Sequence, residues 1–275
     1  MTWKDAPPIT RAFLALTASI FAVRMALARQ YLLTTGIQAS VPLHDHFFPW
    51  VLREPSLLAA AYFAPFCTEL PVLLRPSQRR MRRHAIMVTL CAGILLVHQA
   101  SYFFATWVVV FWAGLFLMWM AGSALDEPQR ACSNGPLLAQ ALVSFWFLGG
   151  AVGKWTAAYW AGEPFYDLFF AHHPYVVYAL LRVWVDAGAL RSIATWVSRS
   201  VVVIETAMVL TVFLPARTAS AITIVVALGM WLSAGDLFDV AWPIIGTALA
   251  GRILSGATPP RDPLKPRAVL MESVC

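Results

Sequence analysis

Long apolar runs separated by short polar stretches dominate the pattern of the chain. A helix rises about 1.5 Å per residue, so roughly 20 apolar residues cross the hydrocarbon core of a bilayer. Backbone polar groups in hydrocarbon must be paired within their own segment, which favours helices. The pattern therefore predicts an all-α integral membrane protein, a bundle of about eight transmembrane helices. The predicted spans are 10–35, 56–74, 85–101, 102–124, 136–157, 196–215, 218–235 and 238–254.

The composition indicates a chain that is surrounded by lipid. Of its 275 residues, 60% are hydrophobic and only 12% are charged, whereas a soluble domain has about 25% charged residues. The net charge of +6 does not indicate a nucleic-acid partner, because the basic residues lie in short connections between the apolar runs. Membrane lipid is the expected partner, and a metal cofactor is not expected.

A cluster of arginines between the second and third spans predicts the orientation of the chain. Cytoplasmic connections of membrane proteins are enriched in Lys and Arg, so both termini and the 125–135 connection are expected to be cytoplasmic. The expected location is the inner (plasma) membrane of a bacterium. Residues 1–254 are interpreted as one transmembrane domain and 255–275 as a proline-rich basic cytoplasmic tail. The cluster consists of Arg75, Arg79, Arg80, Arg82 and Arg83.

The connection 158–195, which alternation places outside, contains an apolar stretch at 175–185. This stretch is too short to span a bilayer. It predicts a short helix that either lies in the membrane interface or re-enters the membrane.

Lys154 and His98 are the candidate catalytic residues, because ionisable groups at membrane depth are costly and mark functional sites. Both are predicted at the outer membrane face. A desolvated lysine has a lowered pKa and can act as a base. The alternatives are that Lys154 anchors a helix end in the headgroups and that His98 bonds a neighbouring carbonyl.

Other ionisable residues also lie in apolar surroundings. A buried glutamate must be neutralised or paired, so the sequence predicts a Glu205–Arg24 or a Glu69–Arg29 ion pair, with a proton relay as the alternative. The acidic turn between the last two spans contains Asp236. It is either solvated or faces Lys154 across the bundle.

Four histidines occupy the two predicted outer loops. His44 and His46 form an HxH pattern in the first loop, and His172 and His173 are adjacent in the second. Four imidazoles from two loops could bind zinc or copper. Unrelated surface histidines are the other interpretation.

The segment Ala151-Val-Gly-Lys-Trp-Thr-Ala-Ala-Tyr-Trp-Ala-Gly-Glu163 resembles the membrane domain of vitamin K-dependent γ-carboxylase, which belongs to the horizontally transferred transmembrane (HTTM) group. Val97-His-Gln-Ala-Ser-Tyr-Phe103 and Asp236-Leu-Phe-Asp-Val-Ala-Trp-Pro243 resemble two further family segments, in matching order. The resemblance covers about residues 10–254.

The resemblance implies a helical bundle whose site opens to the non-cytoplasmic face. Lys154 would deprotonate a hydroquinone or a similar acidic substrate, and His98 would bind or stabilise the anion. Trp155 and Asp236 would adjoin the cofactor, a quinone or another isoprenoid lipid. The family usually has histidine where this chain has Asp236, and its large non-cytoplasmic domain has no counterpart here. Carboxylation of a protein glutamate is therefore not expected.

Two functions stay open at this point. The first is an HTTM-type enzyme that modifies a quinol-like or peptide substrate and uses Lys154 as base. The second is a non-catalytic accessory subunit of a larger respiratory, photosynthetic or secretion complex, favoured by short loops and by many Trp and Phe residues that offer apolar contact surface.

Overall fold

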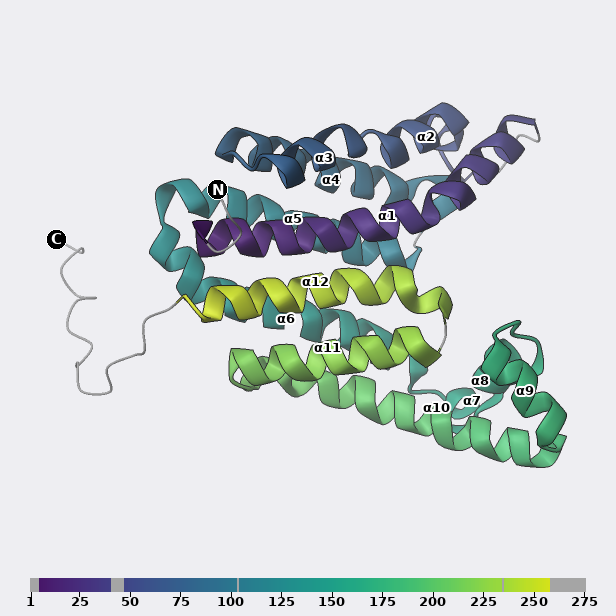
Figure 1. Ribbon diagram of the computed structural model, residues 1–275. Coiled ribbons are helices and arrows are strands. Elements are labelled where there is room, and N and C mark those ends of the chain that lie inside the picture. Colours follow the sequence, from purple (N-terminus) through teal and green to yellow (C-terminus); the bar gives the residue numbers. More distant parts are fainter. Residues whose placement is uncertain (1–4, 41–46, 103, 234, 258–275) are drawn as a thin grey trace, which may run out of the picture.

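The structure is a computed structural model that describes residues 5–40, 47–102, 104–233 and 235–257. Every regular element in these ranges is a helix, and none of the described residues forms a strand. The long helices run side by side, and the turns between them lie at two opposite ends of one bundle (Figure 1). The predicted all-α fold is confirmed for this part of the chain.

The elements follow one another in a simple order, with short helices between the long ones. They are α1 (Pro8–Ser40), η2 (Trp50–Arg53), α2 (Pro55–Phe63), α3 (Phe66–Leu74), α4 (Gln78–Val97), η3 (Gln99–Ser101), α5 (Ala105–Asp126), α6 (Pro128–Lys154), α7 (Ala157–Ala161), α8 (Glu163–Phe165), η4 (Tyr166–Ala171), α9 (Val176–Trp184), α10 (Ala187–Val209), η5 (Leu210–Phe213), α11 (Ala216–Ser233), η6 (Gly235–Leu237) and α12 (Phe238–Ser255).

Six helical stretches of the described chain are long and apolar enough to cross a membrane, so the chain is an integral membrane protein. These stretches are α1, α2 with α3, α5, α6, α10 with η5, and α11. The helices α4 and α12 run along the same bundle (Figure 1). α4 packs on α5, and α12 packs on α1, α6 and α11.

Several predicted boundaries are wrong, and local chemistry explains why. The predicted connection at 125–135 is mostly helix, because Pro128 begins α6 directly after α5 ends at Asp126; proline is favoured in the first helical turn. Four of the five clustered arginines lie in the first turns of α4, where the Ser77 hydroxyl caps the helix by accepting from the Arg80 amide.

α12 is the most enclosed helix, and small residues allow its neighbours to approach. A Cβ atom at Gly246 would lie 1.9 Å from the Ser19 hydroxyl on α1, and one at Gly251 would lie 2.8 Å from the Ala139 Cβ on α6. Small residues at helix contacts are typical of membrane bundles, where close packing replaces the hydrophobic driving force. α12 therefore holds α1 and α6 at close range.

The connection after α6 folds into a small group of short helices beside the start of α10 (Figure 1). Gly162 ends α7 at φ +82° with its Cα against the Thr195 backbone, where a side chain would clash. Phe170, Tyr178 and Leu190 are buried together between η4, α9 and α10. The short helix predicted at 175–185 is present as α9.

Candidate functional site

Lys154 and Glu205 form an ion pair between α6 and α10. The Lys154 Nζ lies 2.5 Å from the Glu205 Oε1, and the two side chains are 26% and 9% exposed. The other carboxylate oxygen, Oε2, has no hydrogen-bond partner among the described residues. Gly150 lies one turn before Lys154, and a Cβ there would stand 3.2 Å from this oxygen. A glycine therefore keeps the space beside Glu205 open.

Glu205 also lines an apolar groove of about 510 Å³, within the size range of small-molecule sites. The walls come mainly from α10 and α11, with α9 and η4 at one side, and Glu205 is the only carboxylate among the described lining residues. An amphiphile with an apolar tail fits such a lining. The other groove residues on α10 are Ile193, Val197, Val201 and Ile204.

Tyr178 on α9 borders this groove and ties it to α11. Its hydroxyl donates a hydrogen bond of 2.6 Å to the Ser233 carbonyl. Burial raises the pKa of the Tyr178 phenol above its ordinary value. The hydroxyl therefore stays protonated and keeps α9 bonded to the end of α11.

Trp155 follows Lys154 directly but contacts α10 through its own ring. The indole Nε1 donates a 3.0 Å hydrogen bond to the Thr206 hydroxyl, and Thr206 is the neighbour of Glu205. This bond aligns the end of α6 with the turn of α10 that carries the carboxylate. The predicted contact of Trp155 with a cofactor stays a prediction.

His98 has both ring nitrogens occupied and is fully buried. Its Nδ1 accepts from the Ala100 amide at 3.2 Å, so Nε2 carries the proton and donates to the Glu54 carbonyl at 3.1 Å. Burial lowers the pKa of this imidazole, and the bond to Glu54 partly opposes that effect. A neutral His98 thus joins the turn after α4 to the start of α2, as its structural interpretation predicts.

The C-terminal ends of α4 and α6 lie at the same end of the bundle (Figure 1), which agrees with the predicted common face of His98 and Lys154. No hydrogen bond or ion pair among the described residues joins these two side chains. The catalytic role of His98 beside Lys154 stays a prediction.

The predicted ion pairs of Glu205 and Glu69 are wrong in their partners. Glu205 pairs with Lys154 instead of Arg24, and Glu69 lies 3.6 Å from Arg24 instead of pairing with Arg29. The hydrophobic pattern shows at what depth a charge lies, but the rotation of each helix decides which charge it meets. Arg24 and Glu69 are both fully buried.

The guanidinium of Arg24 is surrounded by aromatic rings. Its central carbon is 5.1 Å from the ring centres of both Tyr62 and Phe66 and 5.9 Å from that of Trp107. Such contacts stabilise a cation that has left water. This cluster holds α1, α2, α3 and α5 together within the bundle.

The remaining predicted site residues are not brought together in the described part of the chain. His44 and His46 lie outside the described residues, as does the side chain of Asp236, whose backbone belongs to η6. His172 is exposed, and the His173 Nδ1 accepts from the Tyr175 amide. Within the described ranges, no three His, Cys, Asp or Glu side chains gather as a metal site would require.

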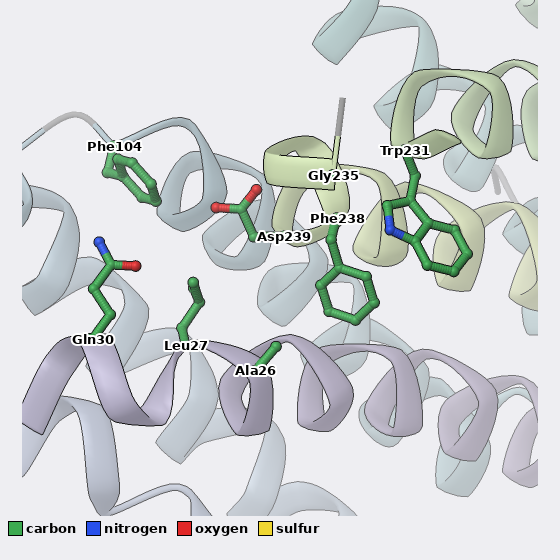
Figure 2. A pocket seen from close by; sticks show the side chains of 8 residues that line it. All are labelled: Ala26, Leu27, Gln30, Phe104, Trp231, Gly235, Phe238 and Asp239. Carbon is green, nitrogen blue, oxygen red and sulfur yellow. The ribbon is translucent and has the colours of Figure 1, made fainter. Parts of the chain in front are cut away.

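The sequence analysis did not identify Asp239 as a candidate site residue. Its side chain is buried at the end of the bundle. The Thr106 hydroxyl on α5 donates to its Oδ2 at 2.5 Å. Asp239 also lines a second cavity, formed by α1, α11 and the first turn of α12 (Figure 2). Asp239 could have been recognised as a candidate from the sequence, because it is an acidic residue in the first turn of an apolar run.

Comparison of the chain with protein-family models, with curated proteins and with solved structures finds no match. The geometry of the site is therefore the basis for its interpretation.

Proposed function

We propose that this protein binds a quinol-like amphiphile from the membrane and takes a proton from its acidic hydroxyl at the Lys154–Glu205 pair. The observation that carries the proposal is a carboxylate, paired to a lysine, in the wall of an otherwise apolar groove. The apolar wall would hold an isoprenoid or alkyl tail. The ion pair would meet the polar head.

The proton transfer conserves charge. The substrate O–H proton passes to the Glu205 carboxylate, and the resulting anion is stabilised by the ammonium of Lys154 at the same site. The Lys154 Nζ and the Glu205 Oε1 lie 2.5 Å apart, so both groups would contact the substrate hydroxyl, and the pair as a whole is the proposed base. This refines the expectation that Lys154 acts alone, and the resemblance of the 151–163 segment to the carboxylase membrane domain supports the same lysine.

The proposal includes eight membrane spans, with α4 and α12 as the two beyond the six recognised by length and hydropathy. It also assigns α9 to the membrane interface, because Val176, Val183 and Trp184 are exposed apolar residues on a helix too short to span. A helix at that depth would border the entrance of the groove from the lipid.

The test uses groove-filling and charge variants of the purified protein in lipid nanodiscs. The probe is a naphthohydroquinone with a decyl tail, kept under anaerobic conditions, whose phenolate has a distinct ultraviolet absorbance. Gly229 lines the groove and has open space around its Cβ position. Gly229→Leu is therefore expected to abolish binding without disturbing the fold, and Glu205→Gln is expected to abolish the phenolate signal.

Gly122→Leu is the matched control, because Gly122 also has open space around it and lies on α5, outside the groove. Glu163→Gln, on an exposed acid of α8, is the control for charge. Probe binding that survives Gly229→Leu, or a phenolate signal that survives Glu205→Gln, would refute the proposal.

A second function, as an accessory subunit, is favoured by one observation. The spanning windows of α10 and α11 are only 28% and 22% buried within the molecule, against 50% and 56% for α1 and α5. A neighbouring subunit would cover that face. The mass of the particle extracted from native membranes in polymer discs decides between the enzyme and the accessory subunit. An accessory subunit has the mass of a larger complex, whereas a solitary enzyme has the mass of one or two copies of this chain.

A further inference from the structure

A buried polar cluster lies between α1, α3 and α4, away from the groove beside Glu205. These three helices are neighbours in the bundle (Figure 1). None of the cluster residues lines the groove, so a ligand here would be independent of the proposed proton transfer. The members of the polar cluster, all 0% exposed, are Thr17, Arg24, Glu69 and His84.

Contacts between the helices bring the polar cluster together. The Arg24 Nε lies 3.6 Å from the Glu69 Oε1, and Thr17 precedes Arg24 by about two helical turns on the same face of α1. The hydroxyl of Thr68, the residue before Glu69, is 3.0 Å from the His84 Nδ1. The Arg24 guanidinium is also close enough to the His84 ring for an electrostatic interaction. The four side chains therefore form one continuous polar region inside the bundle.

Most polar atoms of this cluster have no hydrogen-bond partner among the described residues. This holds for the three guanidinium nitrogens of Arg24, both carboxyl oxygens of Glu69, the Thr17 hydroxyl and the His84 Nε2. The 3.6 Å separation within the Arg24–Glu69 pair is too long for a hydrogen bond. Buried polar groups in folded proteins nearly always have a partner, so the cluster indicates a bound species that supplies the hydrogen bonds.

The bonds of His84 show which of its nitrogens is the acceptor. The Thr68 hydroxyl donates its single proton to the Pro65 carbonyl at 2.9 Å, so it accepts from the His84 Nδ1. The proton of the neutral ring is therefore on Nδ1. The ring presents a lone pair at Nε2, inside the polar cluster.

The mixture of donors and acceptors selects the chemistry of the ligand. Arg24 only donates, whereas Glu69 and the His84 Nε2 offer acceptors. A small anion would bond to the guanidinium but would leave these acceptors without donors. A metal cation would bond to the acceptors but would be repelled by the guanidinium, which stays charged. Water both donates and accepts, and a buried water molecule makes about three hydrogen bonds.

We infer that Thr17, Arg24, Glu69 and His84 bind a small group of internal water molecules. The rings of Tyr62 and Phe66 lie over the guanidinium carbon, and the N–H groups point outward in the plane of the guanidinium, where water can accept from them. The bound water solvates the Arg24–Glu69 pair and links it to the His84 imidazole through hydrogen bonds.

The first experiment labels the purified protein in nanodiscs with hydroxyl radicals, which an X-ray pulse forms from water enriched in a heavy oxygen isotope. A radical formed from a bound water oxidises the side chain beside it, even where bulk solvent does not reach. Phe13 contacts the His84 ring and Tyr62 contacts Arg24. Both are fully buried, as is Met120 in the apolar core. The two rings are expected to gain the isotope and Met120 is not, although methionine is oxidised more readily.

A pair of threonine variants tests the site without changing a charge. Thr17→Val removes a hydroxyl that has no partner, keeps the shape of the side chain, and is expected to cause a loss of label at Phe13, one turn away. Thr89→Val is the matched control, because the Thr89 hydroxyl already donates to the Ala85 carbonyl at 2.8 Å. Equal label at Phe13 in the wild type and Thr17→Val would overturn the inference.

The double variant Arg24→Met with Glu69→Met removes most polar atoms of the cluster and is expected to lose the label at Tyr62. Thr17→Val keeps the inference testable if the double variant fails to fold. No label at either ring of the wild type, label at Met120 equal to that of the rings, or an unchanged label in the folded double variant would each contradict bound water.

The second experiment measures magnetisation transfer from water protons to histidine nitrogens by solid-state NMR. His98 is the internal control, since it is also fully buried but both its nitrogens are bonded within the protein. Transfer to the His84 Nε2, whose signal is absent in His84→Gln, is expected to be faster than transfer to the His98 Nε2. Equal rates would overturn the inference. Glu205→Gln is expected to leave both experiments unchanged, so their outcome is separate from that of the proposed function.

Discussion

Arg24 and Glu69 show how a residue-scale arrangement makes a charge tolerable inside the bundle. Each is fully buried, and the two lie close enough to neutralise each other. Three aromatic rings replace part of the water that the guanidinium has lost. A buried pair contributes little net stability compared with apolar residues, but removing one partner leaves an uncompensated charge.

Glu69→Gln is therefore expected to destabilise the protein by about 3–5 kcal/mol, because Arg24 stays charged without its partner. The double variant Arg24→Met with Glu69→Met should recover most of that loss. Thermal unfolding in detergent, followed by circular dichroism, measures both. A single variant as stable as the wild type would show that the two charges do not depend on each other.

His98 predicts a pH dependence of stability. Its pKa in the folded protein lies below the ordinary 6.5 because of burial. As pH falls through about 6.5, the unfolded chain binds a proton that the folded chain does not, so this histidine lowers the free energy of unfolding. The wild type should lose more stability than His98→Gln between pH 7 and pH 5. Parallel losses in the two proteins would contradict this effect.

The sequence identified the charged residues that lie within the bundle, but it did not predict which of them form ion pairs with each other. Arg24, Glu69, Lys154 and Glu205 were identifiable because charges are rare within apolar runs. The pairing of Lys154 with Glu205 depends on how α6 and α10 are rotated toward each other, and the hydrophobic pattern of helices that face lipid does not determine that rotation.

At the scale of elements, small residues of α12 allow the neighbouring helices to pack closely against it. Eleven of its residues, from Asp239 to Leu254, are buried, and it lies between α1 and α11 in the bundle (Figure 1). Its glycines let neighbouring backbones approach more closely than any larger residue would permit.

Gly246→Ala tests this packing. The added Cβ would fall 1.9 Å from the Ser19 hydroxyl oxygen and 2.7 Å from its Cβ, so α1 must shift. A loss of about 1–3 kcal/mol is expected from such overpacking, and Ser19→Gly in the same chain should relieve it. Gly122→Ala is the control, since its Cβ position is open. Equal unfolding temperatures for the two alanine variants would refute the close contact.

Element types were predictable from the sequence, and element ends were less so. Apolar runs reveal the part of a helix that contacts lipid, whereas α4 and α6 begin seven or eight residues before their runs, in polar sequence that Ser77 and Pro128 initiate. The apolar run 56–74 is divided into α2 and α3 near Pro65, which interrupts the backbone hydrogen bonding.

For the whole molecule, successive turns between the long helices lie at alternate ends of the bundle, as the predicted order of the spans requires. The start of α1, the α3–α4 turn, the α10–α11 turn and the end of α12 lie at one end (Figure 1). The exposed arginines of α4 belong to that end. The positive-inside rule predicts that this end is the cytoplasmic one.

Single-cysteine labelling in intact cells tests the orientation, starting from a variant without native cysteines. Arg79→Cys and Arg217→Cys, in the turns at the arginine end, should resist a membrane-impermeant maleimide until the cells are opened. Ser192→Cys, an exposed position near the start of α10, should react at once. Labelling of all three positions in intact cells would contradict an eight-span arrangement.

The length of α1 has a consequence for the bilayer around the protein. Its 33 residues extend about 50 Å, while the hydrocarbon core measures about 30 Å. Leu32, Leu33 and Ile37 near its end are exposed and apolar, so they avoid water by remaining in contact with acyl chains. A helix that is longer than the hydrocarbon core is thick is expected to tilt or to thicken the surrounding leaflets.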